Sequence, residues 1–90
     1  MNLNTERINV ALTKKVLDDT RWFVIDADAR CLPAGIVWTQ VLASPQLPDV
    51  LIAKTEAGDF FWYDDTRYDT ADVFAMTAFL AKWNRDHGYA

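Results

Sequence analysis

The chain has 90 residues, of which 51% are hydrophobic and 24% charged; this composition is typical of a folded domain and excludes a disordered chain. The length leaves room for one domain over residues 1–90, with little interior for a deep catalytic pocket. The net charge is -4, and residues 46–90 carry eight acidic but only four basic groups, a field that disfavours direct nucleic acid binding.

The single cysteine, Cys31, cannot form an internal disulfide, and one cysteine without a histidine cluster cannot build a structural zinc site. A nucleophilic Cys31 would need a nearby base, and His87 is the only histidine. No glycine motif that could form an oxyanion hole is present, so we interpret the thiol as inert. No stretch approaches the roughly 18 apolar residues that span a bilayer. We therefore expect a cytoplasmic protein with no membrane partner and no cofactor.

Residues 5–19 are predicted to form the first helix. Ile8, Leu12 and Val16 recur at helical spacing behind Thr5, a candidate N-cap.

Four strands are predicted after this helix. Residues 21–26 and 36–42 are rich in aromatic and β-branched side chains, and a loop containing several turn-forming residues separates them. Residues 50–55 and 60–63 are the third and fourth strands, joined as a hairpin by residues 56–59, where glycine can take the positive φ that such loops need.

The last helix is expected to run from a cap at Asp69 or Thr70 to about Asp86, and His87 and Gly88 are a natural stop. Its predicted apolar stripe consists of Val73, Met76, Thr77, Leu80 and Trp83, widened by Phe74, Ala78 and Ala81.

This order predicts an α+β fold: a four-stranded antiparallel sheet with an N-terminal and a C-terminal helix, in the order αββββα, with both helices on one face. The other face of the sheet is expected to be at least partly open. Side chains alternate along the fourth strand, so Phe60 and Trp62 are expected to point inward. The predicted outer set is Asp59, Phe61, Tyr63 and Asp65. The alternative is that other elements cover this face and all the aromatic side chains belong to the core.

No catalytic or cofactor motif is present, so we expect a protein that is not an enzyme and that binds a protein partner with a basic surface. Aromatic side chains beside charge are typical of protein interfaces. The expected contact residues are Phe61, Tyr63 and Tyr68 as apolar anchors, with Asp59, Asp64, Asp65 and Asp69 steering the partner. By analogy of size and charge alone, such a protein resembles inhibitors, antitoxins and phage anti-defence factors that cover nucleic-acid-binding surfaces.

Two alternatives remain open. Four aspartates in residues 64–72 could bind a small ligand or a divalent metal, although they match no calcium-loop pattern. They are better explained as turn residues (Asp64 and Asp65) and as residues of the helix start (Asp69 and Asp72). A homodimer or larger homo-oligomer could also form through strand edges or the open sheet face.

Overall fold

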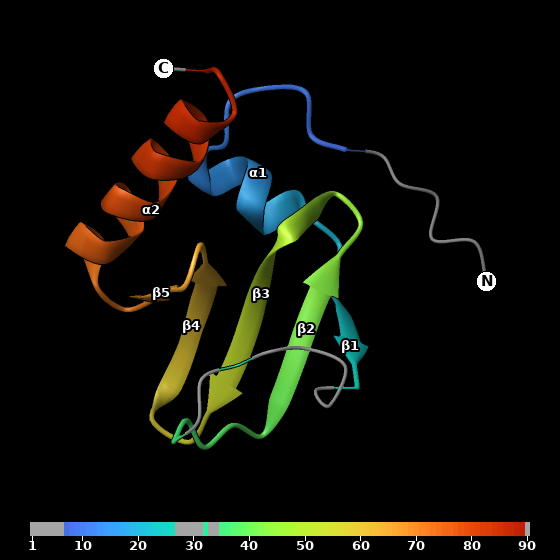
Figure 1. Ribbon diagram of the computed structural model, residues 1–90, viewed down its shortest axis with the longest axis vertical. Coiled ribbons are helices and arrows are strands. Elements are labelled where there is room, and N and C mark those ends of the chain that lie inside the picture. Colours follow the sequence, from blue (N-terminus) through green and yellow to red (C-terminus); the bar gives the residue numbers. More distant parts are fainter. Residues whose placement is uncertain (1–6, 27–31, 33–34, 90) are drawn as a thin grey trace.

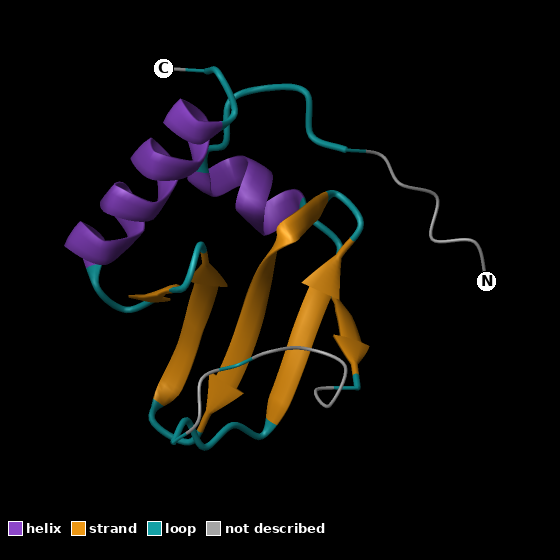
Figure 2. Ribbon diagram, viewed as in Figure 1, coloured by secondary structure: helices purple, strands orange, loops and turns teal. Residues whose placement is uncertain are grey.

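The computed structural model describes residues 7–26, 32 and 35–89. Its elements, in chain order, are α1 (Lys14–Asp19), β1 (Phe23–Ile25), β2 (Gln40–Ser44), β3 (Leu47–Thr55), β4 (Gly58–Tyr63), β5 (Thr66–Asp69) and α2 (Val73–Asp86) (Figures 1 and 2). The strands form one antiparallel sheet in the order β1-β2-β3-β4-β5, so each strand pairs with its neighbour in the chain. The predicted α+β class is confirmed, with five strands where four were expected.

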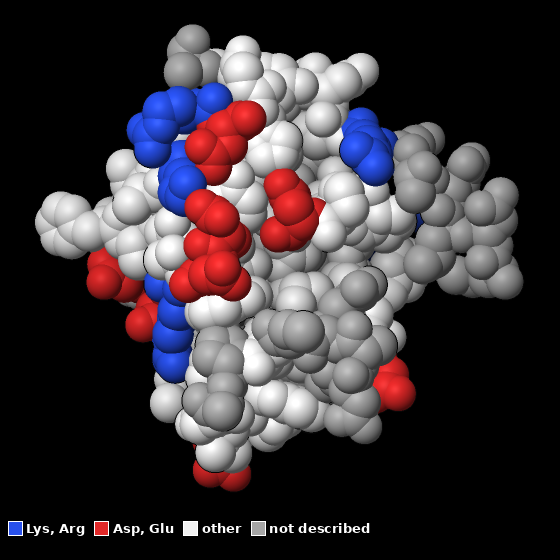
Figure 3. All heavy atoms as spheres, in the orientation of Figure 1, with Lys and Arg blue, Asp and Glu red and all other residues white. Residues whose placement is uncertain are grey.

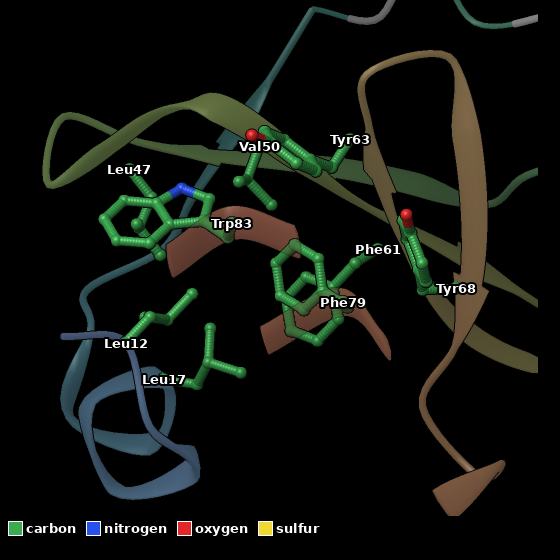
Figure 4. Packing of buried hydrophobic residues seen from close by; sticks show 9 residues of the cluster. All are labelled: Leu12, Leu17, Leu47, Val50, Phe61, Tyr63, Tyr68, Phe79 and Trp83. Atoms are coloured by element: carbon green, nitrogen blue, oxygen red, sulfur yellow. The ribbon is translucent and has the colours of Figure 1, made fainter. Parts of the chain in front are cut away.

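Both helices pack on the same face of the sheet. Tyr63 lies opposite Val50, and Phe61 lies opposite Tyr68, so these four side chains share one face. Helices α1 and α2 close over this face and complete a single core cluster (Figure 4). The cluster consists of Leu12, Leu17, Leu47, Val50, Phe61, Tyr63, Tyr68, Phe79 and Trp83.

The first helix is shorter than predicted. It begins at Lys14, after the N-cap Thr13, whose side chain accepts a hydrogen bond from the backbone of Val16. Residues 7–13 are not helical, because the chain there is tied to α2: the Asn84 side chain accepts from the N–H of Leu12 at 2.6 Å and donates to its carbonyl at 2.9 Å. The proposed cap Thr5 lies outside the described residues.

The strand boundaries also differ from the prediction. The second strand covers residues 40–44 rather than 36–42, and the third begins at Leu47 and includes Pro48, next to an irregularity in its pairing with β2. A strand tolerates proline at such a point because a ladder hydrogen bond is already missing there. Gly58 follows the turn between β3 and β4 with φ 130°, the positive φ predicted for it. Most of the predicted loop before β2, with Cys31, lies outside the described residues.

Strand β5 was missed, because residues 64–70 were interpreted as a turn. The turn itself is only Asp64 and Asp65, whose φ angles of 49° and 56° are both left-handed. Two consecutive left-handed residues are the geometry of a tight hairpin turn, and aspartate tolerates it better than most residues. The chain therefore returns at once as β5, and α2 starts later than expected, after the N-cap Asp72.

The far face of the sheet is not bare at its centre. Val41, Ala53 and Phe60 lie side by side across β2, β3 and β4, and all three are almost completely buried. The guanidinium of Arg67, on β5, lies 4.3 Å from the centre of the Phe60 ring. The sheet thus buries side chains on both faces, and the expected open face is covered at these positions.

Candidate protein-binding groove

The three predicted aromatic anchors are core residues. Phe61, Tyr63 and Tyr68 are 7%, 5% and 8% exposed and face the helices. The ring of Phe79, on α2, stacks on Phe61 at 5.0 Å and lies within 6 Å of the other two rings. The prediction that Phe61 and Tyr63 form an outer face was wrong, because Phe60 and Trp62 supply an equally apolar second face and alternation alone does not say which one the helices cover.

The four predicted acidic contact residues are at the surface or partly buried. Three of them are in ion pairs within the chain, and Asp65 lies exposed in the β4–β5 turn. The pairs are Lys54–Asp59 (3.2 Å), Lys82–Asp64 (3.0 Å) and Arg67–Asp69 (2.8 Å). Acidic side chains gather in a band across the face shown in Figure 3, with lysine and arginine beside them.

The carboxylates of residues 64–72 do not converge on a common point. Asp64 pairs with Lys82, while the Asp72 side chain accepts from the backbone N–H groups of Phe74 and Ala75 and so caps α2. In the part of the chain that the structure describes, no three histidine, cysteine or acidic side chains gather into a metal-ligand set. The interpretation of Asp72 as a helix-start residue is confirmed, whereas the cap expected at Asp69 or Thr70 was wrong.

A groove of about 570 Å³ runs between α1 and α2 above the sheet. Trp22, Ile52 and Phe61 line it from the sheet side, and the helices line it with apolar side chains such as Leu17 and Leu80. Its remaining lining residues are Lys14, Asp18, Asp59, Thr70, Val73, Met76 and Thr77. Most of its surface is apolar, a character typical of sites that hold an apolar group of a ligand or partner.

The groove opens beside two exposed apolar side chains of α2. Val73, which lines it, is 75% exposed, and its neighbour Phe74 is 86% exposed. Both were expected to belong to the buried stripe of the last helix. The inner side of α2 is formed by Ala75, Met76, Phe79, Leu80 and Trp83, so Met76, Leu80 and Trp83 of the predicted stripe do pack against the core. The sequence signal that could have corrected the stripe is the placement of Phe79 on the same face as Trp83.

Aspartate and histidine side chains meet at the end of α2, around a smaller hollow of about 270 Å³. His87 caps the helix: its Nε2 atom lies 2.8 Å from the carboxylate of Asp49, and its Nδ1 atom lies 2.6 Å from the carbonyl of Trp83. The imidazole also stacks on the Trp83 indole at 3.8 Å, and the indole N–H donates to Asp49. These side chains are engaged with one another and join α2 to β3.

Tyr63 connects the core to the same end of α2. Its hydroxyl donates to Asp86 at 2.6 Å, and Lys82 lies 3.0 Å from both Asp86 and Asp64. Burial, together with the hydrogen bond to Asp86, raises the pKa of Tyr63. The hydrogen bonds from Tyr63 and Lys82 lower the pKa of Asp86, and Asp64 and Asp86 raise the pKa of Lys82. Lys82 is therefore paired with two carboxylates, and one of them also accepts the hydrogen bond from Tyr63.

Comparison with protein-family models, with curated proteins and with solved structures finds no match for this chain. Within the described ranges, no helix is long and apolar enough to cross a membrane.

Proposed function

We propose that this chain is a non-enzymatic protein-binding domain of the cytoplasm that holds an apolar segment of a partner in the groove between α1 and α2. The observation that carries the proposal is the apolar groove itself, with a floor that includes Trp22 and Phe61 and an exposed Val73 at its edge. An apolar groove that opens at the protein surface is typical of sites that bind an apolar group of a ligand or partner.

Charge around the groove favours a partner with basic side chains next to its apolar segment. Asp18 and Asp59 line the groove, and the lysines that pair with them do so in an exposed contact and a half-exposed contact, which contribute little to stability. A basic side chain of the partner can therefore replace either lysine at small cost. The excess of acidic groups in residues 46–90 would speed the encounter, an effect that salt weakens.

The experiment is a quantitative capture of proteins from a lysate of the source cells, at low and high salt, with two matched variants. Val73→Asp places a charge at the groove, and aspartate in the first turn of α2 suits the helix start, so the fold is expected to persist. Val37→Asp makes the same change at a side chain that is 82% exposed and does not line the groove.

We expect wild type and Val37→Asp to capture the same partner, and Val73→Asp to lose it while keeping the wild-type melting temperature. Capture is expected to weaken at high salt. Equal capture by Val73→Asp, or no partner captured by the wild type, would refute the groove as a protein-binding site.

A further inference from the structure

The outward side of α2 is a continuous surface without charge over most of its length. Phe74, Ala78 and Ala81 are exposed on this side, and the first charged residue of the line is Arg85. A surface helix normally places charged and polar residues on its solvent side. The outward side of α2 lacks these charged residues over most of its length, and it is distinct from the side that lines the groove.

The spacing of these four residues is symmetric. The steps from Phe74 to Ala78, from Ala78 to Ala81 and from Ala81 to Arg85 are four, three and four residues, and they read the same in both directions. When a second copy of the helix lies antiparallel across a two-fold axis between Ala78 and Ala81, each alanine meets the other alanine of the second copy. Each Phe74 then meets an Arg85.

We propose that the outward side of α2 pairs in this way with the same side of a second copy of this chain. The alanines let the two helix axes approach closely, to about 8 Å. The guanidinium of Arg85 lies against the ring of Phe74 of the second copy, a favourable cation–π contact that the two-fold axis makes twice. In the described residues, Arg85 has no ion pair and Phe74 has no aromatic partner, so both are available.

Charge at the two ends of α2 supports the antiparallel direction. Asp72 caps the first turn, whereas Arg85 lies in the last turn. Antiparallel pairing brings the acidic start of each helix beside the basic end of the other, and it also sets the helix dipoles in opposition. A parallel pair would place like charges together at both ends.

The size of the contact predicts a weak, reversible dimer. A helix of 14 residues is about 21 Å long, and one side of it covers less than the roughly 800 Å² per partner of a standard interface. The groove is lined by Val73, Met76 and Leu80 on the adjoining side of α2, so the dimer leaves it accessible.

The first test is sedimentation equilibrium of pure protein over rising concentration. Phe74→Lys sets two positive charges against each other and removes two buried rings, so we expect association to weaken about a hundredfold. Phe74→Lys combined with Arg85→Glu restores an attractive contact and is expected to restore the dimer. Within one helix these positions are 11 residues apart, about 16 Å, so they cannot pair inside a copy.

The control is Val37→Lys, which changes an exposed valine away from α2 and is expected to associate as the wild type does. A wild type that stays monomeric at every concentration would overturn the proposal. So would undiminished association of Phe74→Lys, or a double variant that remains as monomeric as Phe74→Lys.

Cysteine cross-linking tests the direction independently, in a Cys31→Ser background. A mixture of Ala78→Cys and Ala81→Cys chains is expected to form disulfide-linked heterodimers in higher yield than either variant alone. A parallel arrangement would instead favour the two homodimers, and equal yields in all three samples would mean that no fixed pairing exists. Either of these results contradicts the antiparallel dimer.

Discussion

Helix α2 carries two phenylalanines five residues apart that have opposite surroundings. Phe79 is completely buried and contacts the rings of Phe61, Tyr63 and Tyr68. Phe74 is 86% exposed and has no ring neighbour among the described residues. The inner side of the helix packs against the core and stabilises the fold, whereas apolar surface on the outer side remains accessible to another molecule.

The two sides of α2 thus differ in role, because one side packs in the core and the other side is exposed. We therefore expect substitutions on the inner side of α2 to lower the free energy of unfolding, and substitutions on the outer side to change self-association alone.

Phe79→Ala is expected to lower the free energy of unfolding by about 3–5 kcal/mol, because it leaves a cavity in a close-packed aromatic cluster. That is a large share of the 5–15 kcal/mol typical of a small domain. Urea denaturation measures the loss. A loss below about 1 kcal/mol would show that α2 is not the main cover of this sheet face.

Asn84→Ala removes both hydrogen bonds to the backbone of Leu12, a residue that is almost completely buried. We expect a loss of about 2–3 kcal/mol in the free energy of unfolding, because two backbone groups lose their partners. Asn84→Asp keeps an acceptor for the Leu12 N–H but no donor for the carbonyl, and should therefore lie between wild type and Asn84→Ala. Equal stability of all three proteins would show that the hydrogen bonds between Asn84 and Leu12 do not stabilise the fold.

Tyr63→Phe removes the hydrogen bond to Asp86 and is expected to cost about 1 kcal/mol at neutral pH. The pKa of Asp86 is lowered in the folded state, so its contribution is present above its ordinary value of 3.8 and lost as pH falls through the folded value. The pKa of Tyr63 is raised, so its contribution is present below its ordinary value of 10.0 and lost as pH rises beyond it.

Denaturation of wild type and Tyr63→Phe at several pH values therefore tests whether the Tyr63 hydroxyl and the Asp86 carboxylate stabilise the fold as a pair. The difference in stability from wild type should be largest between about pH 5 and pH 9 and should shrink toward both extremes. A difference that does not change with pH would mean that the hydroxyl and the carboxylate do not act as a pair.

Phe74→Ala is expected to change the free energy of unfolding by less than about 0.5 kcal/mol in dilute solution, because the ring is exposed. The same variant should weaken self-association in sedimentation at high concentration. A large loss of stability in dilute protein would show that Phe74 packs in the core, as Phe79 does, and would contradict the difference between the two sides of α2.

Much of the fold could be predicted from local patterns. Alternation put Phe61 and Tyr63 on one face of the fourth strand, and the acidic and apolar pattern after residue 70 indicated the last helix. The face that the helices cover could not be predicted, because Phe60 and Trp62 are as apolar as Phe61 and Tyr63. Burial of Phe60 together with Phe61 and Tyr63 is a tertiary outcome, which depends on what packs on each face of the sheet.

The errors at the first helix and at the groove share a cause. Ile8 and Leu12 have helical spacing, yet a side chain 72 residues further along the chain holds Leu12 in a non-helical segment. The groove depends on where α1 ends and on how it lies relative to α2, which no local pattern contains. The acidic residues 59–69 could be recognised as surface, but two of their ion pairs depend on tertiary structure. The Lys54–Asp59 pair requires the register of β3 and β4, and the Lys82–Asp64 pair requires the position of α2.

The tie between Leu12 and Asn84 also has a consequence for how the chain folds during synthesis. Strands β1–β5 pair with their immediate neighbours, so the sheet can form progressively as the ribosome releases it. The aromatic face of the sheet cannot be closed until α2 has emerged, because α2 provides both Phe79 and the side chain that anchors the segment before α1. A nascent chain interrupted before residue 73 exposes Phe61, Tyr63 and Tyr68 to chaperones and proteases, and completion of the last helix ends that exposure.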